Sequence, residues 1–197
     1  MFAKFSPDST RVAYVHDNNV YVENLKRGKI KQLTKRDKSS IINGTVDWAY
    51  EEEFGIRDGF KWSPNGKRIA YFQFDTEGVG SFHIVNYLAG NYSQVIDLPY
   101  PKVGTTNSAV RVGVVRTKSG KTEWLDDLPG DPRQHYIPRF YWGGNSKSLV
   151  LQRMNRLQNT NTLWMANLKK NTLKPQWHCR PIWTLFAFIA QTFHKHE

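Results

Sequence analysis

Two stretches of this chain repeat one pattern, FSPDSTRVAYV at residues 5–15 and WSPNGKRIAYF at residues 62–72. Each has an aromatic residue, Ser-Pro, a polar turn, a basic residue and then an apolar run that contains tyrosine. A weaker copy, WGGNSKSLVLQ, occupies residues 142–152. Because proline presets φ and Asn or Gly accepts the left-handed conformation, each copy predicts a tight turn followed by a strand.

A second alternating segment follows each copy and predicts another strand: NNVYVENL (residues 18–25), SFHIVNYLAG (81–90) and NTLWMANLKK (161–170). Short antiparallel strands that recur with a turn signal are typical of a β-propeller, whose blades cannot bury their faces alone. A β-sandwich with coincidental turns is the alternative, but the recurring aromatic-Ser-Pro pattern favours the propeller. We therefore predict an all-β fold, a partial β-propeller of about three blades over residues 1–170.

The composition fits strands, because 14% of the 197 residues are aromatic and aromatic side chains favour sheets. Three blades do not close a ring of about seven or eight. We therefore expect a piece of a larger propeller, with edge strands left open. The chain opens without a signal-peptide pattern. Its longest apolar run, residues 181–193, is shorter than the roughly 20 residues of a membrane-spanning helix, so no span is predicted.

Residues 171–197 differ from the rest, because the strand alternation stops there. We expect an irregular or helical tail, with an out-of-frame translation product as the alternative reading of this segment. The tail holds the single cysteine and three of the six histidines. Its possible metal ligands are His178, Cys179, His194 and His196. Their spacing matches no common zinc pattern and no acidic residue joins them before Glu197, so we predict no metal site.

The net charge is +11, and the densest basic run is KRGKIKQLTKRDK at Lys26–Lys38. Such a run can indicate nucleic-acid binding. Its pattern also predicts a solvent-exposed hairpin with a turn at Arg27-Gly28, and we favour the hairpin because the run lacks interleaved aromatic residues. We predict no nucleic-acid partner. There is also no glycine-rich phosphate loop, so no cofactor is predicted.

Against this basic background, VDWAYEEEFGI at residues 46–56 concentrates four carboxylates. Glutamates near a helix N-terminus are stabilised by the helix dipole, so a short, solvated helix is one interpretation. The flanking aromatic residues suggest a partly buried segment, and buried carboxylates need cations. A primary ammonium group has three donors and no acceptor, so it suits a pair of carboxylates.

Three segments together resemble the dipeptidyl peptidase IV family of serine exopeptidases. They are NGTVDWAYEEEFGIRDGFKWSPNGKRIAYFQFD (residues 43–75), DLPYPKVGTTNSAVRVGVV (97–115) and HYIPRFYWGGNSKSLVLQRMNRLQNTNTLWMAN (135–167). The resemblance covers roughly residues 5–167. It implies an eight-bladed propeller that caps an α/β-hydrolase domain, in an enzyme that releases X-Pro or X-Ala dipeptides from peptides with a free N-terminus.

Carried over by position, the resemblance assigns Glu52 and Glu53 to the binding of the substrate's α-amino group, in the central cavity. Glu51 is the flanking residue, and Asp47 and Tyr50 are possible supporting residues. The segment at 99–115 resembles a propeller extension that contributes to dimer contacts, so we expect a possible dimer contact there.

The chain also departs from the family pattern. It has no G-x-S-x-G nucleophile elbow and no counterpart of the triad Asp and His. Ser108 stands where the family usually has proline. The family's cavity arginine lies in an earlier blade, before Met1, and the resemblance ends after Asn167. We therefore expect a fragment that carries amine recognition without catalytic machinery and is inactive alone. A non-catalytic propeller interaction module is the alternative. The family acts outside the cytosol or at membranes, but the compartment of this chain is not predicted.

Overall fold

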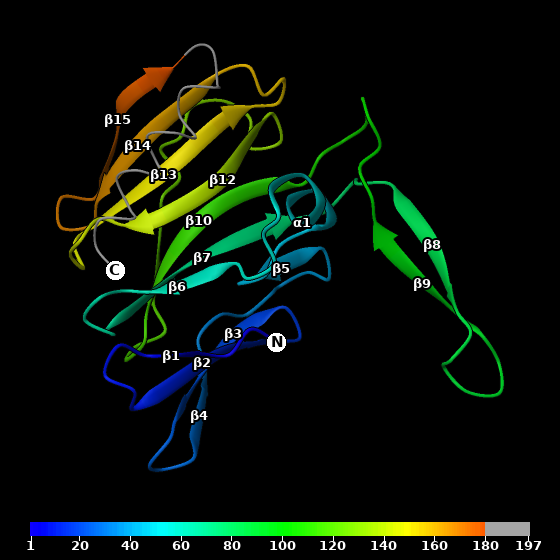
Figure 1. Ribbon diagram of the computed structural model, residues 1–197, viewed down its shortest axis with the longest axis horizontal. Helices are drawn as coiled ribbons and strands as arrows, with labels where there is room; N and C mark the ends of the chain where they lie inside the picture. Colours follow the sequence, from blue (N-terminus) through cyan, green and yellow to red (C-terminus); the bar gives the residue numbers. More distant parts are fainter. Residues whose placement is uncertain (180–197) are drawn as a thin grey trace.

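The computed structural model describes residues 1–179, in which three antiparallel sheets follow one another along the chain (Figure 1). Blade 1 contains β1 (Lys4–Phe5), β2 (Arg11–His16), β3 (Asn19–Asn24) and β4 (Lys29–Gln32). Blade 2 contains β5 (Ile41–Asn43), β6 (Phe60–Trp62), β7 (Arg68–Asp75), β10 (Ala109–Arg116) and β11 (Thr122–Trp124). Blade 3 contains β12 (His135–Trp142), β13 (Ser148–Asn155), β14 (Asn161–Asn167) and β15 (Thr172–Cys179). The predicted partial propeller of about three blades is confirmed.

The repeated motifs form equivalent turns in blades 1 and 2. In the first, the Ser6 amide donates to the Arg11 carbonyl at 2.8 Å, and the Arg11 amide donates to Ser6 Oγ at 3.1 Å. In the second, Ser63 and Arg68 make the same two bonds at 2.9 and 3.0 Å. The serine hydroxyl therefore closes the turn that the sequence pattern predicts, and it sets the register of the strand that follows.

Tryptophans of the motif link each blade to the one before it. Trp62 Nε1 donates to the Lys4 carbonyl at 3.0 Å, and Trp142 Nε1 donates to the Lys61 carbonyl at 3.2 Å. In both cases the acceptor directly precedes the motif's aromatic residue in the preceding blade. These bonds bring the first strands β1, β6 and β12 together on one side of the arc.

Apolar side chains fill the two junctions between blades. One cluster joins blades 1 and 2 and includes Val15, Phe60 and Tyr71, all buried. The larger cluster joins blade 2 to blade 3 and includes Phe72 and Phe140, whose ring centroids are 4.6 Å apart. Face-to-face packing of this kind is what each blade requires, since a single sheet cannot bury its own apolar face.

Blade 2 carries two insertions. Its first strand is divided into β5 and β6, which pair with successive parts of β7, and helix α1 (Trp48–Phe54) lies between them. A ribbon of β8 (Ser81–Asn86) and β9 (Gln94–Pro99) lies between β7 and β10, and it stands apart from the three sheets (Figure 1).

The prediction that residues 81–90 form the next strand of blade 2 is wrong, because these residues belong to the ribbon. SFHIVNYLAG forms β8 and its turn, whereas the place beside β7 belongs to β10, with Gly113 opposite Tyr71. Alternation in a sequence predicts a strand but does not identify its partner. The two strands differ in burial, because β8 is largely exposed while Val112 and Val114 of β10 are fully buried.

The sheet also continues past the predicted boundary at residue 170. Thr172–Cys179 form β15, which pairs with β14 from Asn167↔Thr172 to Asn161↔Cys179 and completes blade 3. The rest of the predicted tail, including His194 and His196, lies outside the described residues. No helix within residues 1–179 has the length and apolar character needed to cross a bilayer.

Candidate functional site

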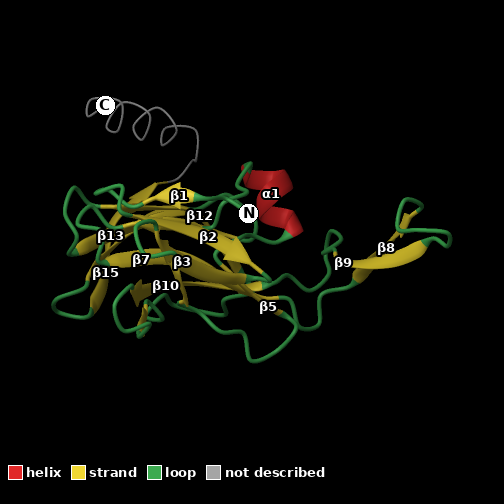
Figure 2. Ribbon diagram, turned by 90° about the horizontal axis from the view of Figure 1, so that it is seen from below, coloured by secondary structure: helices red, strands yellow, loops and turns green. Residues whose placement is uncertain are grey.

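The glutamate segment connects β5 to β6, and a glycine at each end bonds to β7. The Gly44 amide donates to the Phe72 carbonyl at 2.9 Å, and the Phe72 amide donates to the Gly59 carbonyl at 2.8 Å. The Gly59 amide also donates to the Gly44 carbonyl at 3.0 Å. A Cβ on Gly59 would lie 2.6 Å from the Thr45 carbonyl oxygen, so this closure requires glycine. The segment therefore forms a closed loop at the divided first strand of blade 2, and Figure 2 shows α1 at one side of the sheets.

Asp47 caps the N-terminus of α1 and is not available to a ligand. Its carboxylate accepts a hydrogen bond from the Tyr50 amide at 3.0 Å, and its exposed fraction is 6%. Burial raises the pKa of Asp47, and the Tyr50 amide and the nearby Ser108 hydroxyl partly oppose this rise. The structure therefore gives this predicted supporting residue a local role as an N-cap.

Tyr50 anchors the helix to blade 3. Its hydroxyl accepts a hydrogen bond from the Ile137 amide at 2.7 Å, at the point where the β12–β13 register shifts. Its ring packs edge-to-face against Phe74 at 4.7 Å. Complete burial raises the pKa of Tyr50 well above its ordinary value, so the hydroxyl stays protonated. Tyr50 thus fixes the position of α1, and its supporting role in substrate binding stays a prediction.

The C-terminus of α1 is held by a glycine and an arginine. Gly55 adopts a left-handed conformation with φ of 60°, and its amide donates to the Glu51 carbonyl at 3.1 Å. Arg139 of β12 donates from Nη2 to the Phe54 carbonyl at 2.9 Å. A helix of only seven residues is not stable alone in water, so these anchors at both ends determine where its glutamates lie.

The three glutamates have different environments. Glu51 Oε1 forms an ion pair with Arg57 Nε at 3.0 Å. Glu53 Oε2 accepts a hydrogen bond from Gln158 Nε2 of the β13–β14 turn at 3.3 Å, and the Glu52 side chain contacts no polar partner among residues 1–179. Glu52 and Glu53 are both exposed, and neither is paired with a cation of the described chain.

The expectation that these two glutamates line a central cavity stays a prediction. Helix α1, which carries both residues, lies between β5 and β6, the divided first strand of blade 2. The three described blades form only part of such an enclosure.

A family model for the dipeptidyl peptidase IV (DPP IV) N-terminal region matches residues 1–195. The chain belongs to the dipeptidyl peptidase IV family. The match includes residues 171–195, although the resemblance seen in the sequence ended after Asn167.

Solved structures and curated relatives agree with this assignment. A crystal structure of Porphyromonas gingivalis dipeptidyl peptidase 4 superposes with a TM-score of 0.83 at 30% identity, covering 92% of this chain and 26% of that one. Dipeptidyl aminopeptidase B of Saccharomyces cerevisiae is 34% identical over 75% of this chain and 19% of its own length. Prolyl endopeptidase FAP of Mus musculus is 30% identical over 88% of this chain and 23% of its own length. The chain thus spans about a fifth to a quarter of these relatives.

A cationic cavity of about 170 Å³ lies beside the C-terminal end of α1 in this dipeptidyl peptidase IV family member. Arg57, Lys61 and Arg139 line it, together with Asp58, which pairs with Lys4. Burial lowers the pKa of Lys61, whose ammonium group lies 4.3 Å from the centroid of the Tyr141 ring. Glu52 and Glu53 do not line this cavity.

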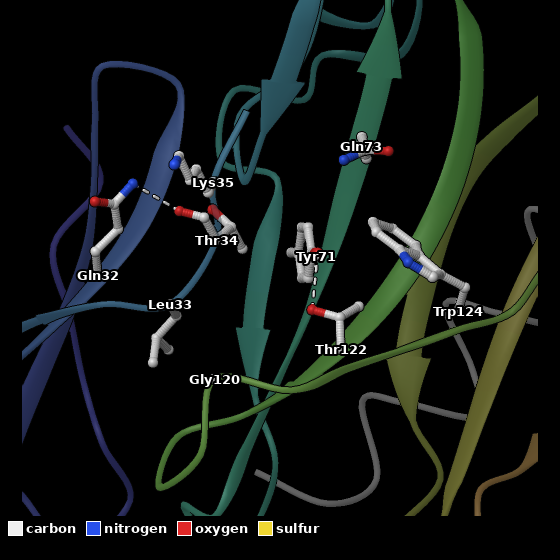
Figure 3. Close-up of a pocket in the computed structure, with 9 residues that line it drawn as sticks. All are labelled: Gln32, Leu33, Thr34, Lys35, Tyr71, Gln73, Gly120, Thr122 and Trp124. Carbon is white, nitrogen blue, oxygen red and sulfur yellow. Dashed lines mark hydrogen bonds between the residues drawn. The ribbon is translucent and has the colours of Figure 1, made fainter. Parts of the chain in front are cut away.

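A larger cavity of about 460 Å³ lies between the segment that follows β4 of blade 1 and strands β7 and β11 of blade 2 (Figure 3). Its lining is mainly polar and aromatic, and Tyr71 shares a hydrogen bond of 3.2 Å with Thr122. Burial raises the pKa of Tyr71 to about 12, so this hydroxyl is not a base at neutral pH. Sequence reasoning missed the cavity because its two walls come from different blades.

The predicted dimer segment at 99–115 is divided by the structure of this family member. Residues 109–115 belong to β10, which is paired on both sides within blade 2. The projecting element is the β8–β9 ribbon, which contacts α1 through aromatic rings. The ring centroid of Tyr100 lies 4.1 Å from that of Trp48 and 5.6 Å from that of Phe82, and both pairs are tilted. The dimer contact itself stays a prediction.

No group of three or more His, Cys, Asp or Glu within residues 1–179 is placed to hold a metal ion. His178 of β15 instead shares a hydrogen bond of 3.0 Å with Thr162 Oγ1.

Proposed function

We propose that this chain supplies the amine-recognition site of a dipeptidyl peptidase IV-type peptidase, with Glu52 and Glu53 binding the free α-amino group of a peptide substrate. The observation that carries the proposal is the contrast within the EEE run. Arg57 neutralises Glu51, whereas Glu52 and Glu53 have no cationic partner among the described residues. In a chain of net charge +11, two unpaired neighbouring carboxylates favour a cation that arrives with the ligand.

The ligand's chemistry follows from the groups that face it. A peptide α-amino group has a pKa near 8, so it is an ammonium group with three donors at neutral pH. Hydrogen bonds to charged groups contribute about 1.5–3 kcal/mol each, although an exposed ion pair contributes no more than about 1 kcal/mol. Strong selection for a free N-terminus therefore requires further blades to shield Glu52 and Glu53 from water.

Helix geometry limits how the two carboxylates act together. Adjacent residues on a helix point about 100° apart, so both side chains must turn toward the same point to share one ammonium group. The hydrogen bond from Gln158 turns the Glu53 side chain toward blade 3. The Glu52 side chain must turn the same way for both carboxylates to bind one ammonium group.

Cleavage requires groups outside this site. Acyl transfer to water needs a nucleophile, a base and an oxyanion hole together, and the sequence contains no G-x-S-x-G elbow. We propose that the chain alone hydrolyses nothing. In the longer enzyme the distance from Glu52 and Glu53 to the nucleophile would select the dipeptide that is released, with proline or alanine second.

A non-catalytic interaction module is the second candidate, and the β8–β9 ribbon favours it. Leu88 and Tyr92 at its tip are 96% and 88% exposed, and Phe82, Ile84 and Ile96 share one half-exposed face. A relative from Mus musculus with the name inactive dipeptidyl peptidase 10 is 31% identical over 84% of this chain. Under this proposal the ribbon forms a dimer contact, and sedimentation analysis should show a defined dimer that is lost when Leu88 and Tyr92 are replaced by serine.

Titration calorimetry with glycyl-prolyl amide and its N-acetylated form tests the amine site. We expect weak binding of the free amine, with a Kd of about 1 mM, which corresponds to roughly −4 kcal/mol. Acetylation and the E52Q/E53Q variant should each abolish this binding, while E51Q should leave it intact. Equal binding of the acetylated peptide would refute the amine site. The chain alone should not hydrolyse a Gly-Pro chromogenic substrate. Hydrolysis that is stopped by a serine-directed inhibitor would refute this prediction.

A further inference from the structure

The basic run Lys26–Lys38 has no part in the amine site, and three of its seven cations line a groove. As predicted, the run begins with a hairpin, whose turn contains Gly28 with φ of 60° between β3 and β4. A groove of about 190 Å³ opens where this hairpin meets the β10–β11 turn of blade 2. Its charged lining residues are Arg11, Arg27, Lys29 and Lys31, and none of its lining residues is acidic.

Two cations at the end of the run are paired with carboxylates. Arg36 pairs with Asp17 and Lys38 pairs with Glu77, each at 2.8 Å. The groove cations differ, because no ion pair joins the side chains of Arg27, Lys29 or Lys31 to a carboxylate within the part of the chain that the structure describes.

Two groove cations also donate to neutral groups. Lys31 Nζ donates to the Lys118 carbonyl at 2.5 Å, and Arg11 donates to Thr117 Oγ1 at 3.3 Å. Arg11 forms an ion pair with Asp8, with Nη2 3.5 Å from Oδ2. One groove cation is therefore paired with a carboxylate, whereas Arg27, Lys29 and Lys31 are not paired within the described residues.

Two of the groove cations lie in a row along the outermost strand of blade 1, and Arg27 lies in the turn that precedes this strand. Lys29 and Lys31 are two residues apart on β4 and pair with Asn24 and Val22, so they share the face turned toward blade 2. Residues at this spacing lie about 7 Å apart along a strand. Such a row fits a linear molecule that carries anionic groups at regular intervals.

The surroundings of the groove favour a carbohydrate over other polyanions. Sites for single-stranded nucleic acid combine cations with exposed aromatic platforms for base stacking, and no aromatic residue lines this groove. Membrane-surface sites present apolar and basic side chains together. Ile30, which is 55% exposed, points to the opposite face of β4 from Lys29 and Lys31, so a flat bilayer cannot contact both.

We propose that the groove between the β3–β4 hairpin and the β10–β11 turn binds a sulfated polysaccharide, with Arg27, Lys29 and Lys31 contacting its sulfate groups. This binding is independent of the amine site, because the groove lies on outer strands whereas α1 lies on the first-strand edge. The chain would then attach to an anionic glycan while its glutamates face a peptide.

Fluorescence polarisation with a labelled heparin octasaccharide tests the proposal on the intact chain. The groove variant is R27Q/K29Q/K31Q. The matched control K102Q/K147Q/K169Q removes the same charge from exposed lysines elsewhere. By analogy with single-stranded polyanions, where each contact contributes about 0.7 to the slope of log K against log salt, the groove variant should reduce that slope by about two. We expect its affinity to fall at least tenfold at low salt, and the control's less than threefold.

Each alternative result is decisive. Equal losses in the two variants would show a general effect of net charge and would overturn the proposal. The same assay is run with a single-stranded DNA oligonucleotide and with anionic vesicles. If either binds the wild-type chain more tightly than the octasaccharide does, and depends on the same groove residues, the groove is assigned to that partner instead. Thermal unfolding of both variants at the wild-type temperature confirms that each is folded.

Discussion

Replacing Tyr50 with phenylalanine removes one oxygen atom from the contact between α1 and β12. That oxygen is the acceptor for the Ile137 amide, which lies in the register shift of β12. The aromatic ring stays in place, so its packing against Phe74 and the rest of the core is kept. The substitution therefore isolates a single buried hydrogen bond.

The size of the effect follows from the amide that is left behind. A buried N–H without a partner costs about 1–3 kcal/mol, because the desolvation of the donor is no longer offset. We expect the free energy of unfolding to fall by about 2 kcal/mol. With a urea m-value of about 2 kcal/mol/M, the unfolding midpoint falls by about 1 M.

Urea unfolding followed by tryptophan fluorescence, with amide hydrogen exchange at Ile137, measures the effect. Tyr14→Phe is the matched control, because the Tyr14 hydroxyl forms no hydrogen bond within residues 1–179 and its loss should change stability by less than about 0.5 kcal/mol. Equal midpoints for Tyr50→Phe and wild type, with unchanged exchange at Ile137, would refute the claim that this bond anchors α1.

Two further predictions concern a hydrogen bond between blades and a buried histidine of blade 3. Trp62→Phe should lower the free energy of unfolding by about 1–3 kcal/mol in the same urea assay, since the Lys4 carbonyl loses its donor; a change within 0.5 kcal/mol would argue against a structural link between blades. His135 is 3% exposed, and burial together with the Arg153 charge lowers its pKa from 6.5 to about 4. The neutral side chain therefore stabilises the fold fully above pH 6.5. This contribution of up to about 3 kcal/mol is lost as the pH falls toward 4. Urea unfolding at several pH values should show a shallower acid slope for His135→Gln, and identical slopes would contradict the assignment.

Features encoded within a few residues could be predicted from the sequence. The Ser-Pro turns are local, because Ser63 bonds to Arg68 within the motif itself. The partner of β7 could not be predicted, because an insertion that forms its own ribbon has the same alternation as a blade strand. The role of Trp62 in joining blades depends on a carbonyl in another blade, which no local pattern shows.

In the candidate site, too, local features could be predicted from the sequence and contacts between distant residues could not. A short helix over the glutamates was one of the predicted interpretations, and α1 occupies that segment. The roles of Asp47 and Tyr50 as cap and anchor needed the structure, because Tyr50 acts through an amide of blade 3. Glu51 differs from Glu52 and Glu53 because it forms an ion pair with Arg57. This pair depends on how the chain folds back after Gly55, which the sequence does not show.

The most direct test of the amine site follows the side-chain carboxyl carbons of Glu51, Glu52 and Glu53 by NMR while glycyl-prolyl amide is added at pH 7. The account predicts that the Glu52 and Glu53 signals shift together and saturate with one affinity, while Glu51, already paired with Arg57, does not follow that curve. Equal, non-saturating shifts of all three signals, or identical shifts with the N-acetylated amide, would contradict it.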